Sequence, residues 1–399
     1  MRIGFLSAFN FGSSIGGVEN HIYFISGEFA KLGHEVYLFQ PVLDDFPGVN
    51  VSESNIHQLV KIVRIGVPAP FIIKSFFASG RIDRLGFASA FLYKARFFAA
   101  TKIIADAVEK FDCDVIHQHD FISSLFASKR LAKGGHRVYL TNHTGEYLFL
   151  KKMLLGRLFL KWALRHYDCV IGPSLELTPV EYSNAVTIYN GVDSDVFVDF
   201  DSCKRTSVRK KLGLAPSDFV VLCPRRWAPT KGVIFLAKSI AQNEFPKEFK
   251  FLFAGSDYVG YPAYSDEVLG VLSECDSDSL RLLGNLSVSE MVSVYNAADV
   301  VVIPSLMEAV SLSAVEAMSC GAVVVSTNVG GMPELISDGV NGILIEAKSS
   351  SEIYRSLVEL FQNPDYYSAL RRAAFHTASR FQWRQIAKKT LDVYQGYSH

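Results

Sequence analysis

The sequence predicts an α/β protein with two doubly wound domains, and three observations support this. Short apolar segments alternate with stretches of helical periodicity along all 399 residues. The apolar segments are continuous rather than alternating, which is typical of parallel strands that are buried on both faces. The length also exceeds what one hydrophobic core usually serves, so two domains are expected.

The strands are expected at the apolar segments, in chain order. In the first half they lie at residues 3–8, 35–40, 114–117, 138–141, 169–172 and 186–189, and in the second half at 219–223, 250–254, 280–283, 300–304, 322–326 and 342–345. The polar segment 190–218 separates the two series and is expected to hold the domain boundary. Ligands of open parallel sheets bind beyond the carboxyl ends of the strands, so a cleft between the two domains is the expected site.

The composition excludes several classes of protein. Hydrophobic residues make up 49% of the chain and charged residues 20%, which excludes a disordered protein. Because 40 basic residues balance 40 acidic ones, we expect no nucleic-acid partner bound through bulk charge. The 6 cysteines are scattered, which fits reduced thiols, and no apolar run reaches the roughly 20 residues of a spanning helix. We expect a cytoplasmic protein, either soluble or peripheral on the inner face of the cell membrane.

A glycine-rich turn follows the first expected strand. Gly16 and Gly17 precede a helix that runs to about residue 32, and they lack the spacing of a dinucleotide-binding fingerprint. Their amides carry no side chains and suit the close approach of a phosphate or an acceptor. A plain tight turn is the alternative.

Two glutamates flank the start of a helix that follows the strand expected at 300–304. Glu308 precedes this helix, Ser311 and Leu312 lie at its first turn, and Glu316 lies about one turn inside it. Amides at a helix N-terminus suit a diphosphate, and carboxylates accept hydrogen bonds from sugar hydroxyls. The spacing therefore matches a nucleotide-sugar, with an ordinary capped helix as the alternative.

Two cations lie on the loop after the strand expected at 219–223. Arg226 and Lys231 could converge on one diphosphate and neutralise the charge that grows on a departing nucleotide. No Asp-x-Asp metal cluster lies beside them. We expect neither a metal nor another cofactor, and surface solvation of the two cations is the alternative.

Histidines follow two neighbouring strands of the first domain. His143 follows the strand at 138–141, and His117 and His119 lie at the end of the strand before it. An imidazole at this position could hydrogen-bond a sugar hydroxyl or an acceptor. Histidines with no nearby cysteine or matched carboxylate are more typical of a polar cleft than of a metal site, so no metal is expected here.

Together these motifs resemble the group 1 family of retaining glycosyltransferases with the GT-B fold. The resemblance covers the whole chain and rests on ordered motifs at residues 16–19, His143, residues 190–193, residues 226–232, Glu308 with Glu316, residues 330–334, residues 338–342 and residues 381–383. It implies two Rossmann-like domains that face a cleft. The acceptor domain would span residues 1–193, completed by about 382–399 where the final helix crosses back, and the donor domain 194–381.

The resemblance also implies a role for each site residue. Arg226 and Lys231 would bind the donor diphosphate, Glu316 the ribose hydroxyls, Glu308 the transferred sugar, the amides around Ser311 and Leu312 the phosphate oxygens, and His143 the donor sugar or the acceptor. Family members keep the anomeric configuration by front-face attack, in which the leaving phosphate takes the acceptor proton. Where the family commonly has Glu-Gly-Phe-Gly, this chain has Glu-Ala-Val-Ser at residues 308–311, and the added side chains put the identity of the donor sugar in doubt.

Acceptors in this family bind mainly to the first domain, which is basic and aromatic here. Residues 60–105 carry 8 cations and 1 acid among several phenylalanines, and residues 147–167 carry no acid. The second stretch contains Lys151, Lys152, Arg157 and Lys161 among leucines and aromatic residues. This composition suits an anionic membrane surface or a lipid-linked acceptor. Helices that pack on a core, with cations at the edge, are the alternative.

The sequence therefore predicts a retaining hexosyltransferase that uses a UDP- or GDP-sugar. Its acceptor would be a glycan, lipid-linked, in the biosynthesis of cell-surface polysaccharide, lipopolysaccharide or glycolipid. A glycosyltransferase with a soluble acceptor and a nucleotide-sugar 2-epimerase of the same fold are the alternatives, and the epimerase would act with no acceptor present. The intact Arg226, Lys231, Glu308 and Glu316 disfavour a non-catalytic binding subunit.

Overall fold

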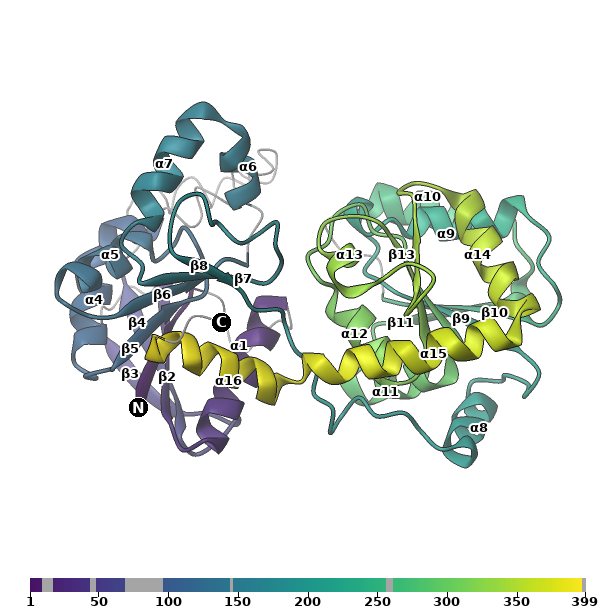
Figure 1. The fold of residues 1–399 in the computed structure, drawn as a ribbon, viewed down its shortest axis with the longest axis horizontal. Helices are drawn as coiled ribbons and strands as arrows, with labels where there is room; N and C mark the ends of the chain where they lie inside the picture. The colour runs from purple at the N-terminus through teal and green to yellow at the C-terminus, as the bar shows by residue number, and fades with distance from the viewer. Residues whose placement is uncertain (9–16, 44–47, 69–95, 144–145, 256–260, 397–399) are drawn as a thin grey trace. The chain divides into compact units, whose positions relative to one another are not determined.

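The structure is a computed structural model that describes residues 1–8, 17–43, 48–68, 96–143, 146–255 and 261–396. The chain divides into two compact units, Met1–Tyr189 with Trp383–His399, and Asn190–Gln382 (Figure 1). The first segment of the first unit ends at Tyr189, whereas the resemblance implies a domain boundary after residue 193. The two units are α/β and each has its own sheet, which agrees with the predicted fold class.

The first unit is built on an eight-stranded sheet in the order β3-β4-β2-β1-β5-β6-β7-β8. Neighbouring strands are parallel except β3, which pairs antiparallel with β4. The central strands are almost wholly buried, as expected of strands covered by helices on both sides. The strands are β1 (Arg2–Leu6), β2 (Glu35–Leu43), β3 (Val49–Glu53), β4 (Val60–Val67), β5 (Val115–Gln118), β6 (Val138–Thr141), β7 (Cys169–Gly172) and β8 (Ala185–Thr187).

The strands β3 and β4 lie in a stretch for which the sequence predicts no strand. Their pattern differs from that of the other strands because they lie at one edge of the sheet. In β4, Val63 and Ile65 are buried, whereas Lys61 and Arg64 are exposed. Side chains of a strand point alternately to its two faces, so Lys61 and Arg64 lie on opposite faces of β4, next to the edge strand β3, and neither face is completely covered.

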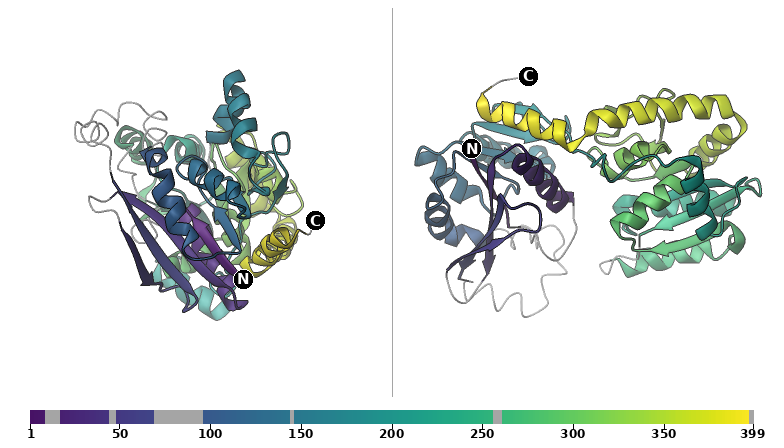
Figure 2. Two further views of the ribbon diagram at one scale, coloured as in Figure 1. Left: turned by 90° about the vertical axis from the view of Figure 1, so that its left-hand side faces the viewer. Right: turned by 90° about the horizontal axis from the view of Figure 1, so that it is seen from below.

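The helices of the first unit cover this sheet, and one of them comes from the far end of the chain. The unit contains α1 (Gly17–Lys31), α4 (Thr101–Glu109), α5 (Leu125–Lys133), α6 (Glu146–Lys152), α7 (Leu154–Leu164) and α16 (Trp383–Gln395). α16 packs against α1, and both lie along the same side of the unit in Figures 1 and 2. Buried Tyr394 of α16 makes a hydrogen bond of 2.5 Å between its hydroxyl and Nδ1 of His117, at the end of β5. The final helix therefore joins the first unit, as predicted.

The second unit has a six-stranded, fully parallel sheet in the order β11-β10-β9-β12-β13-β14. Its strands are β9 (Phe219–Pro224), β10 (Phe249–Ala254), β11 (Leu280–Gly284), β12 (Val300–Ile303), β13 (Val323–Thr327) and β14 (Ile343–Ile345). Its helices include α8 (Ser202–Lys211), α9 (Val233–Gln242), α10 (Pro262–Leu272), α11 (Val288–Ala297), α12 (Leu312–Ser319), α13 (Met332–Leu335), α14 (Ser350–Gln362) and α15 (Pro364–Ala378).

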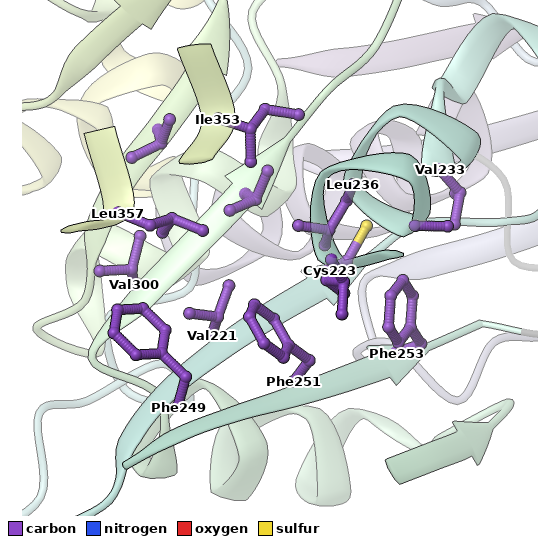
Figure 3. Packing of buried hydrophobic residues seen from close by; sticks show 14 of the residues in the cluster. Val221, Cys223, Val233, Leu236, Phe249, Phe251, Phe253, Val300, Ile353 and Leu357 are labelled. Carbon is purple, nitrogen blue, oxygen red and sulfur yellow. The ribbon is translucent and has the colours of Figure 1, made fainter. Parts of the chain in front are cut away.

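The core of the second unit lies between this sheet and the helices α9 and α14. Phe249, Phe251 and Phe253 of β10 point to the same face of the sheet (Figure 3). Leu236 of α9 and Leu357 of α14 are buried in the same cluster. This packing fixes β9 and β12 in the middle of the sheet, and the loops after these two strands form the candidate site.

The segment between the two series of strands contains a helix. α8 is held to the sheet by Asp299, which comes directly before β12. Its carboxylate accepts from Arg205 at 2.7 Å and from Arg209 at 2.6 Å. The basic run at 204–211 is therefore part of the second unit.

Candidate active site

The candidate site of the second unit lies where β9 and β12 end. These two strands are neighbours and run parallel, so their carboxyl ends meet at the same edge of the sheet. The loop after β9 carries Arg225 and Lys231, and the loop after β12 carries Glu308. Residues distant in sequence are thereby brought together.

Glu308 is the centre of this site. Its Oε1 atom accepts from Nζ of Lys231 at 2.7 Å and from Oγ of Ser305 at 2.9 Å, and it is also bound by Nη2 of Arg225. Only 10% of the Glu308 side chain is exposed. Burial alone would raise the pKa of Glu308, but Arg225 and Lys231 hold it below its ordinary value. Glu308 is therefore a carboxylate at neutral pH.

Arg225 and Lys231 share the single carboxylate of Glu308, so the trio carries a net positive charge. Arg225 is 8% exposed and Lys231 20% exposed, so both charges act in a medium less polar than water. Burial lowers the pKa of Lys231, and the neighbouring Arg225 lowers it further, while Glu308 opposes the shift. An anion placed against the trio would relieve the repulsion between the two cations.

The turn that carries Lys231 depends on a glycine. Gly232 has a φ of 64° and separates a short 3-10 turn, Pro229–Lys231, from α9. A Cβ atom at this position would lie 1.9 Å from the carbonyl oxygen of Pro304, at the end of β12. Only glycine fits here, and the close approach places Lys231 next to the loop that holds Glu308.

The first turn of α12 completes the site. Ser311 is the N-cap residue, but its side chain makes no capping hydrogen bond and instead accepts from Nη2 of Arg225 at 2.7 Å. The first amides of a helix have no partner within the helix, and its N-terminus carries a partial positive charge. Leu312 is the first helical residue. The helix start and the two cations therefore lie together and favour an anionic ligand such as a diphosphate.

Glu316 lies one turn further along α12. The hydroxyl of Tyr295, on α11, donates to its Oε2 atom at 2.9 Å. Burial raises the pKa of Glu316 to about 7, although Tyr295 and Arg225 counteract the shift. Its carboxyl group therefore changes protonation near neutral pH.

The structure separates the two adjacent arginines at the end of β9. Arg226 is exposed, yet it is close enough to Lys231 to contribute to lowering the pKa of Lys231, whereas Arg225 is buried against Glu308 and Ser311. The role expected of Arg226 stays a prediction. The motif at residues 226–232 indicated Arg226, and nothing in the sequence indicated that Arg225 points back toward the loop after β12.

The first unit holds a second cluster, formed by histidines at the ends of β5 and β6. Nδ1 of His119 lies 3.3 Å from Nε2 of His143, and the ring of His21, on α1, lies 4.6 Å from that of His143. Burial and the neighbouring imidazoles lower the pKa values of His119 and His143 well below the usual range. These rings are neutral at pH 7, so each has one nitrogen that donates a hydrogen bond and one that accepts.

These three histidines also have the composition of a metal site. One ring nitrogen from each of His21, His119 and His143 lies within 4.8 Å of the others. His21 could not be predicted as a member of this cluster, because it lies on a helix far from the two strand ends in sequence. The expected absence of a metal stays a prediction.

The glycine turn and the basic stretches are described only in part. Gly17 is the first residue of α1, whereas Gly16 lies outside the described residues. The same holds for Lys74, Arg81, Arg84 and Lys94 of the stretch 60–105.

The basic residues of α6 and α7 surround an exposed apolar tip. Lys152, Arg157 and Lys161 are exposed, and Lys151 pairs with Glu181 at 3.3 Å. The exposed fractions of Leu154, Leu155 and Leu158 are 77%, 76% and 62%, and Phe149 and Met153 are about half exposed. Among the described residues, no helix combines the length and apolarity needed to cross a bilayer.

Comparisons with known proteins agree with this geometry. The profile of Glycosyltransferase Family 4 matches residues 15–196, and that of Glycosyl transferases group 1 matches residues 204–377. An uncharacterized glycosyltransferase of Methanocaldococcus jannaschii is 27% identical over 304 residues, which is 75% of this chain and 80% of that protein. A D-inositol 3-phosphate glycosyltransferase of Mycolicibacterium smegmatis is 30% identical over 221 residues, which is 55% of this chain and 49% of the relative. The match thus spans about half of that relative's length.

Solved structures share the fold at low sequence identity. Sucrose-phosphate synthase from Thermosynechococcus elongatus superposes with a TM-score of 0.76 at 19% identity, covering 99% of this chain and 98% of the other. HepE of Anabaena, solved in complex with UDP-glucose, superposes with a TM-score of 0.73 at 18% identity, covering 99% and 100%. These likenesses establish the GT-B fold.

Proposed function

The chain belongs to the group 1 glycosyltransferases, and from this premise we propose that it transfers a sugar from a UDP- or GDP-sugar to a glycan acceptor. The observation that carries the proposal is the trio of Arg225, Lys231 and Glu308 beside the N-terminus of α12. Two buried cations and a helix start suit a diphosphate, and a fixed carboxylate suits a sugar hydroxyl.

The donor would lie along the loop after β12. Its diphosphate would contact Lys231, Arg225 and the amides around Ser311 and Leu312. The ribose hydroxyls would donate to Glu316, and a hydroxyl of the transferred sugar would donate to Glu308. Arg226 is exposed, and it would contribute to attracting the anionic donor.

We propose retention of the anomeric configuration. Glu308 is bound by two cations and a hydroxyl, and the lowered pKa makes it a poor base and a poor nucleophile. The acceptor hydroxyl would instead attack the face of the sugar from which the nucleoside diphosphate departs. It would give its proton to the departing phosphate. Arg225 and Lys231 would stabilise the negative charge that grows on the diphosphate as the sugar departs. This chemistry needs neither a side-chain nucleophile nor a metal.

The acceptor would bind to the first unit, near His143. The neutral imidazole of His143 could accept a hydrogen bond from an acceptor hydroxyl, or donate one to it, without placing a charge beside it, and buried His119 would orient the ring of His143. We propose that the acceptor is lipid-linked, because the same unit carries the apolar tip and the cations of α6 and α7. Such a surface suits an anionic bilayer, with a role in assembling cell-surface polysaccharide, lipopolysaccharide or glycolipid.

A thermal-shift screen of nucleotide-sugars tests the proposal before any acceptor is known. A donor at 100 times its Kd should add about 2.7 kcal/mol of stability, so the true donor should raise Tm clearly above its competitors. The selected donor is then incubated with and without lipid-linked glycan extracts, and the products are analysed by mass spectrometry. Sugar transfer that requires the extract supports the proposal. Interconversion of the donor with no acceptor present would establish the epimerase instead.

A further inference from the structure

The first unit has a cavity between α4, α5 and α7. It has a volume of about 480 Å³ and is formed entirely by residues of helical segments. Three of the residues that line it are aromatic and three are basic: Phe98, Phe126, Trp162, Lys129, Arg130 and Lys133. None of these residues has a role in the proposed transfer.

The aromatic side chains form one continuous wall. The rings of Phe98 and Phe126 meet edge to face with 4.6 Å between their centroids, and Phe126 lies 5.8 Å from Trp162. Nζ of Lys129 lies 3.4 Å from the centre of the Trp162 ring, which is a close cation–π contact. The cavity thus joins an apolar wall to a fixed positive charge.

The basic side chains come from one turn of α5. Arg130 reaches Asp106 of α4 at 3.4 Å, so three cations face one carboxylate. Burial, together with the nearby Arg165 and Lys133, lowers the pKa of Lys129. The cations therefore repel one another, and an anion in the cavity would be stabilised by Lys129 and Lys133.

Two exposed leucines of α7 lie on the same side of the helix as Trp162, which lines the cavity. Leu158 precedes Trp162 by one helical turn and Leu154 precedes it by two, so the three side chains lie on one side of the helix. Leu154 and Leu158 are largely exposed, whereas Trp162 is half-buried in the cavity. An amphipathic ligand could lie along this side of α7, with its apolar part toward the leucines.

We propose that this cavity binds the phosphate-bearing headgroup of an anionic phospholipid. Lys129 and Lys133 would bind the phosphodiester, the aromatic wall would contact the glycerol region, and the leucines of α7 would enter the acyl layer. The assignment follows from the pairing of charge with apolar surface, since a free phosphate would use only the cations. It rests on the membrane association proposed above and names the lipid class that this association would recognise.

Vesicle flotation tests the lipid preference. Wild-type protein should bind vesicles containing phosphatidylglycerol more tightly than vesicles of phosphatidylcholine alone. The double variant Lys129→Gln/Lys133→Gln should lose about thirtyfold in affinity for the anionic vesicles, equivalent to about 1 kcal/mol for each cation near an anionic surface. The matched control is Lys388→Gln/Lys389→Gln, which removes the same charge from exposed positions of α16 in the same unit. An equal loss of vesicle affinity in the control variant would mean that the basic residues attract the membrane by charge alone, and it would overturn the proposed site.

Trp162 fluorescence separates a lipid from a free phosphate. Short-chain phosphatidylglycerol below its micellar concentration should change the emission of wild-type protein, and Trp162→Phe should remove that change. Short-chain phosphatidylcholine and glycerol 3-phosphate should leave the emission unaltered. The same response to glycerol 3-phosphate would assign the cavity to a small phosphate and refute the lipid proposal.

These outcomes also separate this inference from the proposed function. If the wild type binds no vesicles, the membrane association fails, while the fluorescence experiment still tests the cavity. If the wild type binds anionic vesicles and the Lys129/Lys133 variant binds them equally well, the cavity assignment fails and the association stands. Circular dichroism and thermal melting of each variant check that it is folded.

Discussion

The choice between Arg225 and Arg226 makes the most discriminating prediction about the active site. Arg225 donates to both Glu308 and Ser311 from a buried position, whereas Arg226 is exposed. We expect Arg225→Ala to lower kcat/KM about 100- to 1000-fold, because it removes one fixed donor from a site with low solvent access. Arg226→Ala removes an exposed charge worth about 0.2–1 kcal/mol, which corresponds to at most about a fivefold loss.

The assay compares the two alanine variants with Arg225→Lys. Lysine keeps the charge but lacks the planar guanidinium, whose Nη1 atom also donates to Oγ of Ser313 at 3.4 Å, so its rate should fall between wild type and Arg225→Ala. Initial rates are measured over a range of donor concentrations, and the melting temperature of each variant is recorded. A larger loss for Arg226→Ala than for Arg225→Ala, in folded proteins, would refute the geometric assignment.

Three further predictions follow from the same structure. Lys231→Ala or Glu316→Ala should reduce turnover at least about 100-fold through lost phosphate or ribose contacts, and near-normal transfer by either variant would contradict the site. Glu316 has a folded pKa of about 7 and an ordinary value of 4.5, so its contribution to stability is lost as pH rises between these values. Glu316→Gln should therefore raise the melting temperature at pH 8 relative to wild type while weakening nucleotide binding, and calorimetry with a nucleotide titration checks both. Replacing Lys151, Lys152 and Lys161 together by glutamine should reduce binding to anionic vesicles, and unchanged co-sedimentation would remove the argument for a charged membrane surface.

The strands that could be predicted from the sequence are those buried on both faces. Continuous apolar runs such as those of β6 and β7 have the same bounds in the sequence analysis and in the structure. β4 was missed because Lys61 and Arg64 interrupt its apolar residues. The apolar residues of this strand neither alternate regularly nor form a continuous run, and the stretch was interpreted through its charge.

The site could be predicted as a set of loops, but its internal contacts could not. Sequence motifs placed Lys231, Glu308 and Glu316 at the ends of strands and at a helix start. They did not indicate that Glu308 is shared between Lys231 and Arg225, because that contact depends on the distance between β9 and β12. The partner of Glu316, Tyr295, comes from another helix and carries no motif of its own.

The exposed tip of α7 illustrates a further limit of sequence reasoning. The leucines at positions 154, 155 and 158 are typical of a helix that packs on a core. Whether a leucine is buried depends on the elements that pack around it, and the sequence of the helix alone does not indicate these. Basic and apolar residues are mixed along this helix in the sequence. In the structure Gly156 and Leu160 are buried, whereas Leu154, Leu155 and Leu158 are exposed together with Arg157 and Lys161.

The return of α16 to the first unit has a consequence for how the polypeptide is made. Residues 190–382 form an uninterrupted unit, so this part can fold on the ribosome as soon as it has emerged. The first unit cannot, because its sheet is covered in part by a helix that follows the whole second unit in the chain, and Tyr394 reaches His117 across 277 residues of sequence. The second unit is thus translated in full before the first, and a chain that stops near residue 380 would lack the helix that completes the first unit.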